Sequence, residues 1–241
     1  MSLNKNKNKN KNKNKTYIQP GTTFPANGWE AGMEAVAELP NFFEIPGWRD
    51  LPLEPPPGPS ETAKELVELL RKQKEMEDPC KRAERLTEIK LEADDDCPHL
   101  HRLLALTPSG SYAGTYVLIQ AMFQLGTVIG CHYKKKFMRP RPSQLEPRLR
   151  PLIDVPAWPA YPSGHALQYF LAAKAVGAVV HNDEIAIELI KIADRVAENR
   201  EWAGLHYESD TEAGKRLATL TLPAVLDAYR ETFQGAAREW M

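Results

Sequence analysis

From residue 60 onward, apolar positions recur at the spacing of α-helices, and no segment alternates in the manner of a β-strand. Thr62 and Glu65 match a capping box, which predicts that the first helix begins near residue 60. An aspartate-proline pair at its start predicts a second helix over residues 78–93. A third helix is expected over residues 98–106.

The next segment, residues 107–131, contains no charged side chain. Its length of 25 residues is that of a transmembrane helix, so this alternative has to be considered. Pro108, Gln120 and Gln124 lie within it, and they favour the buried central helix of a bundle instead. A second apolar helix is predicted over residues 166–180.

The C-terminal part of the chain continues the helical pattern. Asp183 is expected to cap an amphipathic helix, whose apolar stripe consists of Ile185, Leu189, Ile192 and Val196. A further helix is expected over residues 206–222, and another after Pro223. With no internal repeat and no strand pattern, the sequence predicts an all-α helical bundle.

The N-terminal part differs from this bundle. Residues 1–15 alternate asparagine and lysine and predict a disordered tail. Residues 16–59 are rich in proline and aromatic residues, and we expect an extended arm with one short helix near residues 29–39. A single α-helical catalytic domain is expected over residues 60–241. The arm's expected anchors are Trp29, Phe42, Phe43 and Trp48.

Composition narrows the class of protein. The 241 residues are 42% hydrophobic and 26% charged, which is ordinary for a globular protein and excludes a fully disordered or fibrous chain. Six of the 31 basic residues lie in residues 1–15, so the remainder is acidic, with a net charge of about −7. We therefore expect no nucleic-acid partner. The three cysteines form no CxxC pair, so neither a disulfide framework nor a zinc site is indicated.

The first candidate cluster is basic and lies within residues 134–142, which read KKKFMRPRP. A solvated basic loop would explain this cluster if it stood alone. The functional interpretation is that Lys134 and Arg141 converge on an oxyanion. A guanidinium offers a planar fork of donors and an ammonium offers a point charge, and both suit phosphate.

The second cluster, residues 161–165, reads YPSGH and directly precedes an apolar helix. Ser163 and Gly164 are thereby placed at a helix N-terminus, where free backbone N–H groups and the helix dipole favour anions. His165 would lie in the first turn and face the anion. An ordinary N-cap serine with an incidental histidine is the structural alternative.

The third cluster, residues 199–210, reads NREWAGLHYESD. Arg200 ends the amphipathic helix, and Gly204 is the expected break. His206 and Asp210 are four residues apart and would share one face of the following helix. A carboxylate that accepts from one ring nitrogen leaves the other free to act as a nucleophile or ligand. A surface pair of little consequence is the alternative.

Together the three clusters resemble the signature of the type-2 phosphatidic acid phosphatase and vanadium haloperoxidase superfamily. The parts of that signature are the Lys134-x6-Arg141-Pro142 element, the Pro162–His165 element and the Arg200-x5-His206-x3-Asp210 element. The first and third parts are closest to the class A bacterial acid phosphatases, whereas residues 159–166 are closer to the haloperoxidases. Asn199 stands where the superfamily usually has serine.

The resemblance implies a metal-independent phosphomonoesterase. His206, oriented by Asp210, would attack phosphorus to form a phosphohistidine, and His165 would protonate the leaving group. The phosphate-binding residues would be Lys134, Arg141, Ser163, Gly164 and Arg200. No cofactor and no metal ion are expected, and the expected partner is a small phosphorylated substrate.

Two other functions stay open. The same pocket could hold vanadate, with His206 as its ligand, in a vanadium-dependent haloperoxidase. A non-catalytic phosphate or phospholipid binder is the third interpretation. We expect no membrane association and leave the oligomeric state open. A cytoplasmic location is expected if the chain is complete, and a periplasmic or secreted one if a leader was removed.

Overall fold

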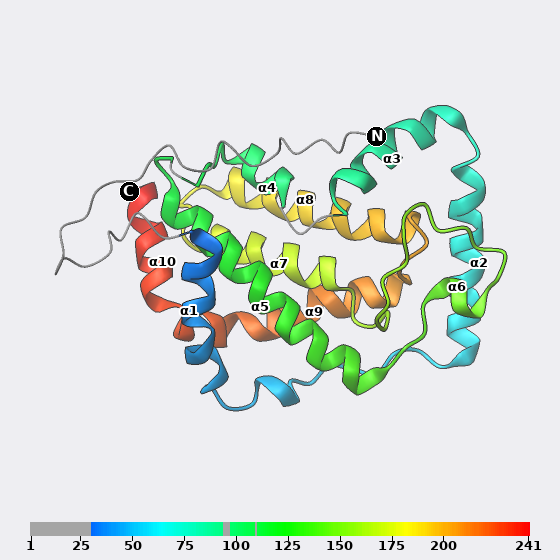
Figure 1. Ribbon diagram of the computed structural model, residues 1–241, viewed down its shortest axis with the longest axis horizontal. Coiled ribbons are helices and arrows are strands. Elements are labelled where there is room, and N and C mark those ends of the chain that lie inside the picture. The colour runs from blue at the N-terminus through cyan, green and yellow to red at the C-terminus, as the bar shows by residue number, and fades with distance from the viewer. Residues whose placement is uncertain (1–29, 94–96, 109) are drawn as a thin grey trace, which may run out of the picture.

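The computed structural model describes residues 30–93, 97–108 and 110–241, and within these ranges it contains helices and no strand (Figure 1). The predicted all-α fold class is therefore confirmed, whereas the predicted tail, residues 1–15, lies outside the described residues. The α-helices are α1 (Ala31–Phe43), α2 (Pro59–Glu75), α3 (Pro79–Leu91), α4 (Pro98–Leu103), α5 (Ala113–Phe137), α6 (Pro142–Leu145), α7 (Gly164–Gly177), α8 (Asp183–Trp202), α9 (Glu208–Ala228) and α10 (Arg230–Ala237). Two short 3-10 helices are η2 (Trp48–Asp50) and η3 (Arg238–Trp240).

Helix α7 lies at the centre of the bundle and packs against α5, α8 and α9 (Figure 1). Its residues are apolar on nearly every side, and all positions from Ala166 to Ala173 are buried. A helix without a polar face is stable only where other helices surround it. Helices α1 and α10 cover the outer side of α5, while α2, α3 and α4 contact α8.

Helix α5 contains most of the uncharged segment, residues 107–131, for which the sequence predicts a buried helix. It begins later and ends later than expected, at Ala113 and Phe137, so Lys134 lies in its last turn. The stretch Ala113–Leu145 is long and apolar enough to cross a membrane, and 56% of its most apolar part is buried inside the protein. A core helix of a bundle passes the same test of length and composition.

The arm is held against α5 by its aromatic residues. Phe42 and Trp48 are buried, whereas Phe43 is 39% exposed and Trp29 lies outside the described residues. The Tyr133 hydroxyl of α5 donates to the Trp48 carbonyl at 3.0 Å and accepts from the Leu51 N–H at 2.9 Å. Helix α1, which falls within the predicted arm, itself packs on α5.

The first helix begins close to residue 60 as predicted, but two of the three predicted caps are wrong and one is confirmed. Helix α2 begins at Pro59 after Gly58, so Thr62 and Glu65 do not form a capping box. Asn182, and not Asp183, caps α8 by accepting from the Ile185 N–H at 3.1 Å. Asp78 caps α3 as predicted. Glu65 thus lies well inside α2, and its carboxylate binds residues of other segments, as described below.

Helix α9 also differs from its prediction. It begins at Glu208, so His206 precedes the helix, and it continues through Pro223 to Ala228. An internal proline costs a helix about 3 kcal/mol. The buried residues Leu217 and Val225 lie on either side of this position, and burial of each apolar side chain contributes about 1.5–3 kcal/mol, which offsets that cost.

A glycine allows α9 to approach the start of α7. A Cβ atom at Gly214 would lie 2.7 Å from both the Ser163 carbonyl oxygen and the Ala166 Cβ. No side chain can be accommodated there without a shift of the backbone. This close approach places the second turn of α9 beside the second candidate cluster.

Candidate active site

The second cluster lies at the N-terminus of α7, as predicted. Ser163 is the N-cap, and its hydroxyl oxygen accepts from the Ala166 N–H at 3.4 Å. Gly164 and His165 form the first turn, where backbone N–H groups have no partner within the helix. The Ser163 N–H donates to the Asp210 carbonyl at 2.9 Å, which joins this cluster to α9.

Arg200 lies in the last turn of α8, and the break that follows it fixes the path toward His206. Gly204 has a φ of +75°, a conformation that favours glycine. The Leu205 N–H donates to the Arg200 carbonyl at 3.0 Å, and the Gly204 N–H donates to the Glu201 carbonyl at 2.8 Å. This pair of bonds is the Schellman motif, and it turns the chain back so that His206 follows Arg200 closely in space.

His206 and Asp210 form a buried pair, although they are not on one helix face as predicted. Asp210 is the third residue of α9, and its carboxylate reaches back over the helix start. Its Oδ2 accepts from His206 Nδ1 at 3.0 Å and from the Tyr207 N–H at 3.1 Å. Because a carboxylate can only accept, the proton lies on Nδ1 and Nε2 carries the lone pair.

Arg141 faces that lone pair. Its Nη1 donates to His206 Nε2 at 3.1 Å and to the Leu205 carbonyl at 3.0 Å, and its Nε donates to the Trp158 carbonyl at 2.9 Å. Its remaining nitrogen, Nη2, is buried and has no hydrogen-bond partner among the described residues. Burial lowers the pKa of the Arg141 guanidinium to about 10.

Lys134 is buried beside the same cluster, but its ammonium is occupied. The Nζ donates to the carbonyls of Pro159, Ala160 and Pro162 at 3.0, 3.1 and 2.6 Å. These bonds use all three donors and hold the segment that leads into α7. Burial, assisted by the charge of Arg141, lowers the pKa of Lys134 to about 7.

Only one of the three guanidinium nitrogens of Arg200 has hydrogen-bond partners among the described residues. Its Nη2 donates to the Ile89 carbonyl at 3.0 Å and to Glu92 Oε2 at 3.2 Å. Its Nε and Nη1 are buried and have no hydrogen-bond partner among the described residues. Burial lowers the pKa of Arg200, while Glu92 opposes that shift.

Both histidines lie in the field of these cations. Burial is the main cause that lowers the pKa of His206 well below its ordinary value, and the charges of Arg141, Lys134 and Arg200 act in the same direction. Burial and then Arg200 lower the pKa of His165 to about 3. The structure therefore brings residues of all three clusters into one electrostatic environment.

Four further residues of the site have roles that were not predicted from the sequence. Glu92, which ends α3, binds Arg200 through its carboxylate and accepts from His165 Nε2 through its backbone carbonyl at 2.9 Å. Asn199, the departure from the family pattern, donates to Glu92 Oε2 at 2.9 Å. Arg139 and Glu65 lie on the other side of Asp210. Arg139 stood within the first cluster, but no local pattern distinguished its role from that of Arg141.

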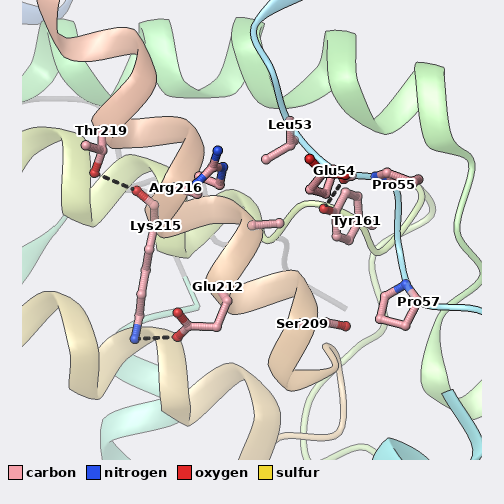
Figure 2. A pocket seen from close by; sticks show the side chains of 11 residues that line it. Leu53, Glu54, Pro55, Pro57, Tyr161, Ser209, Glu212, Lys215, Arg216 and Thr219 are labelled. Atoms are coloured by element: carbon pink, nitrogen blue, oxygen red, sulfur yellow. Dashed lines mark hydrogen bonds and ion pairs between the residues drawn. The ribbon is translucent and has the colours of Figure 1, made fainter. Parts of the chain in front are cut away.

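A separate cavity of about 560 Å³ lies between the arm and the outer surface of α9 (Figure 2). Tyr161 lines it and donates its hydroxyl proton to the Glu54 carbonyl at 2.6 Å, and Lys215 is paired with Glu212. None of the predicted phosphate-binding or catalytic side chains lines this cavity. The described residues also contain no group of three or more His, Cys, Asp or Glu side chains suited to hold a metal ion.

Comparison with known proteins identifies the fold. No protein-family model matches the sequence, and no curated protein matches it. A bacterial vanadium-dependent iodoperoxidase superposes with a TM-score of 0.53 and 18% identity, over 74% of this chain and 54% of that one. A transmembrane PAP2-type phosphatidylglycerolphosphate phosphatase from Bacillus subtilis superposes with a TM-score of 0.52 and 15% identity, over 84% of this chain and 97% of that one. The chain thus spans about half of the iodoperoxidase and nearly all of the phosphatase.

Proposed function

We propose that this chain, which has the fold shared by PAP2-type phosphatases and vanadium haloperoxidases, hydrolyses phosphate monoesters through a phosphohistidine. One observation carries the proposal. Arg141 Nη2, Arg200 Nε and Arg200 Nη1 are buried donors without partners among the described residues. Leaving a buried charged donor unsatisfied is costly, so such groups mark a place where a ligand supplies the acceptors. A tetrahedral oxyanion offers the oxygens that they lack.

Substrate binding uses the two arginines and the start of α7. The unpaired donors of Arg141 and Arg200 would bind non-bridging oxygens, each bond contributing about 1.5–3 kcal/mol. The hydroxyl of Ser163 and the N–H of Gly164 would complete the site at the helix N-terminus. Lys134 would contribute its positive charge from the turn it holds, since its three donors are bound to carbonyls.

His206 would then act as the nucleophile. Its Nε2 lone pair accepts from Arg141 Nη1 at 3.1 Å in the free protein. An incoming phosphate attracts the guanidinium and releases that lone pair for in-line attack. The P–N bond forms as the bond between phosphorus and the leaving oxygen breaks, and Asp210 stabilises the positive charge that develops on the ring.

His165 would supply and later remove the proton. Its Nε2 faces the Glu92 carbonyl, which can only accept, so Nε2 carries a proton and Nδ1 is left for exchange. Burial and then the charge of Arg200 lower its pKa in the free protein. A bound phosphate dianion would neutralise the charge of Arg200 and so raise the pKa of His165 in the complex, which favours the imidazolium. It would protonate the leaving oxygen and then deprotonate the water that hydrolyses the phosphohistidine. Such proton transfer contributes about 10²–10⁴-fold to the rate.

A vanadium-dependent haloperoxidase is the second candidate, because the iodoperoxidase shares the fold. Vanadate has the shape and charge of phosphate, so the unpaired donors of Arg141 and Arg200 fit it equally, with His206 Nε2 as its ligand. When bound, vanadate would supply the activation of peroxide for halide oxidation. The residues of this chain would hold its oxygens and direct His206 toward it.

The proposal is tested by hydrolysis of p-nitrophenyl phosphate in buffer containing EDTA, across pH 4–8. We expect turnover that orthovanadate inhibits. Complete inactivity in this range would contradict the phosphatase assignment. Bromination of a phenolic dye after vanadate loading, without phosphatase activity, would favour the haloperoxidase. Stabilisation by phosphate with neither activity would indicate a non-catalytic binder.

A further inference from the structure

Arg139 lies two residues before Arg141 but has a different set of partners. Its Nη1 donates to Asp210 Oδ1 at 2.6 Å and to the Ser209 hydroxyl at 2.7 Å. Its Nη2 donates to Glu65 Oε2 at 2.7 Å and to the Thr62 hydroxyl at 3.2 Å. Only 4% of its side chain is exposed. Arg139 thus links α2 to α9.

These contacts connect Arg139 to His206 through the carboxylate of Asp210. Asp210 uses one oxygen for His206 and the other for Arg139. The guanidinium also lies 3.8 Å from the centre of the Tyr207 ring, which covers one of its faces. In contrast to Arg141, both of its terminal nitrogens are fully engaged by protein groups, so Arg139 has no role in binding the phosphate.

Glu65 completes the arrangement from α2. One carboxylate oxygen binds Arg139, and the other accepts from the Ser209 N–H at 2.9 Å, in the first turn of α9. Negative and positive charges therefore alternate from Glu65 through Arg139 to Asp210. If the charge of Arg139 were removed, the buried carboxylate of Asp210 would face the carboxylate of Glu65, which is 15% exposed, without a cation between them.

We propose that Arg139, held in place by Glu65, is a positioning residue that keeps Asp210 ionised and thereby keeps the proton of His206 on Nδ1 and its lone pair on Nε2. The inference rests on the proposed function, in which the Nε2 lone pair of His206 is the nucleophile. Burial raises the pKa of Asp210 and Arg139 opposes this shift. The titratable or charged groups that act on Asp210, or that it acts on, are Lys134, Arg139, Arg141, Tyr161, His206 and Tyr207.

The first test is Arg139→Gln, assayed with p-nitrophenyl phosphate over pH 4–8. Loss of the cation raises the pKa values of both members of the His206–Asp210 pair. We expect kcat to fall at least tenfold and the acid limb of the pH profile to move up by about one unit. The KM should change less than threefold, since Arg141 and Arg200 are untouched. Arg139→Lys, which keeps the charge, should keep the limb near its original position.

Glu65→Gln provides a test with the opposite sign, and it also covers the case in which Arg139→Gln does not fold. It removes a negative charge next to Arg139, so the acid limb should move to lower pH. Loss of packing alone could not shift the limb in opposite directions in the two variants. A limb that stays fixed in both variants, or a higher KM with unchanged kcat in Arg139→Gln, would overturn the proposal.

A measurement independent of turnover separates this inference from the proposed function. The Nδ1 proton of His206, bonded to an ionised carboxylate, should give a downfield imidazole resonance in proton NMR. We expect Asp210→Asn to abolish the resonance and Arg139→Gln to move it upfield. An unchanged resonance in Arg139→Gln would overturn the role of Arg139, even if the protein proved inactive toward phosphate esters. If the wild-type protein is inactive toward phosphate esters but the resonance shifts in Arg139→Gln, the proposed function alone is refuted.

Discussion

Arg139 and Arg141 are separated by one proline, and they illustrate two different regions around His206. On the Nδ1 side of His206 lie Glu65, Arg139 and Asp210, which we call the aspartate group. Their charged groups are satisfied by hydrogen bonds to one another and to His206. On the Nε2 side lie Arg141 and Arg200, which we call the anion group. These two side chains have three buried donors without partners among the described residues. Both regions are buried and charged, so burial alone does not distinguish them.

The difference lies in whether the polar groups are satisfied. A fully paired network stabilises one arrangement and has nothing to offer a ligand. A network with unpaired donors is costly in the free protein, and binding of the missing acceptor recovers that cost. The aspartate group therefore positions His206, and the anion group receives the substrate. Substitutions in the aspartate group should consequently change kcat and its pH dependence, whereas substitutions in the anion group should weaken phosphate binding.

The largest effect is expected from His206, which belongs to both regions. His206→Ala should lower turnover by about 10⁴-fold or more, because the nucleophile is lost. Acid-labile phosphoenzyme, trapped with labelled substrate, should vanish, while phosphate still raises the melting temperature through Arg141 and Arg200. A phosphoenzyme that persists in the variant would place the nucleophile elsewhere.

His165→Ala should lower kcat by about 10²–10⁴-fold and leave phosphate binding intact, since His165 handles protons and not the anion. The loss should be smaller for p-nitrophenyl phosphate than for an alkyl phosphate, whose leaving oxygen needs protonation more. Steady-state kinetics on the two esters provide the comparison. Equal losses on both substrates would argue against the role as general acid.

The anion group should show a loss of affinity without a comparable loss of stability. In Arg200→Met, the dissociation constant for phosphate should rise about 100-fold, the value of one or two charge-assisted hydrogen bonds. In phosphate-free buffer the melting temperature should fall less than in Asp210→Asn, which removes the negative charge closest to Arg139. Calorimetric titration and thermal denaturation of the two variants make the comparison. The reverse order of stabilities would contradict the distinction between the two regions.

The smallest expected effect is on pH dependence, through Lys134. Its pKa is lowered to about 7, mainly by burial, so the ammonium is charged below that pH and neutral above it. Phosphate affinity should weaken about tenfold as the pH rises from 6 to 8. The stability of the free protein should instead increase with pH. The pKa of Lys134 is 10.5 in the unfolded chain and about 7 in the folded protein, so between these values the unfolded chain binds one more proton than the folded protein. The contribution of this group to the free energy of unfolding therefore rises across that interval. Titrations of wild type and Lys134→Met would show whether the dependence belongs to this lysine.

Local patterns predicted the parts of the site that depend on local geometry. Ser163 and Gly164 were placed correctly at a helix start, since N-cap preferences act over a few residues. The pairing of His206 with Asp210 was predicted for the wrong reason, because α9 begins only at Glu208. The pair forms through the reach of Asp210 over the helix start.

The remaining parts depend on packing between distant segments. Thr62 and Glu65 have the spacing of a capping box, yet Glu65 binds Arg139 and Ser209, which lie far along the chain. Glu92 stands at the end of α3 in a run of acidic residues, and nothing in that run indicates that it anchors Arg200. Such roles arise only when α2 and α3 dock onto the bundle, so neighbouring residues contain no signal for them.

Whether Arg141 and Arg200 bind a tetrahedral anion that faces His206 can be seen in a crystal structure of the protein soaked with tungstate, a tetrahedral dianion that anomalous scattering locates without ambiguity. We expect one tungstate per chain, within hydrogen-bond distance of Arg141 Nη2 and of Arg200 Nε and Nη1, with His206 Nε2 facing the metal. A tungstate bound elsewhere, with these donors still unpaired, would contradict this expectation.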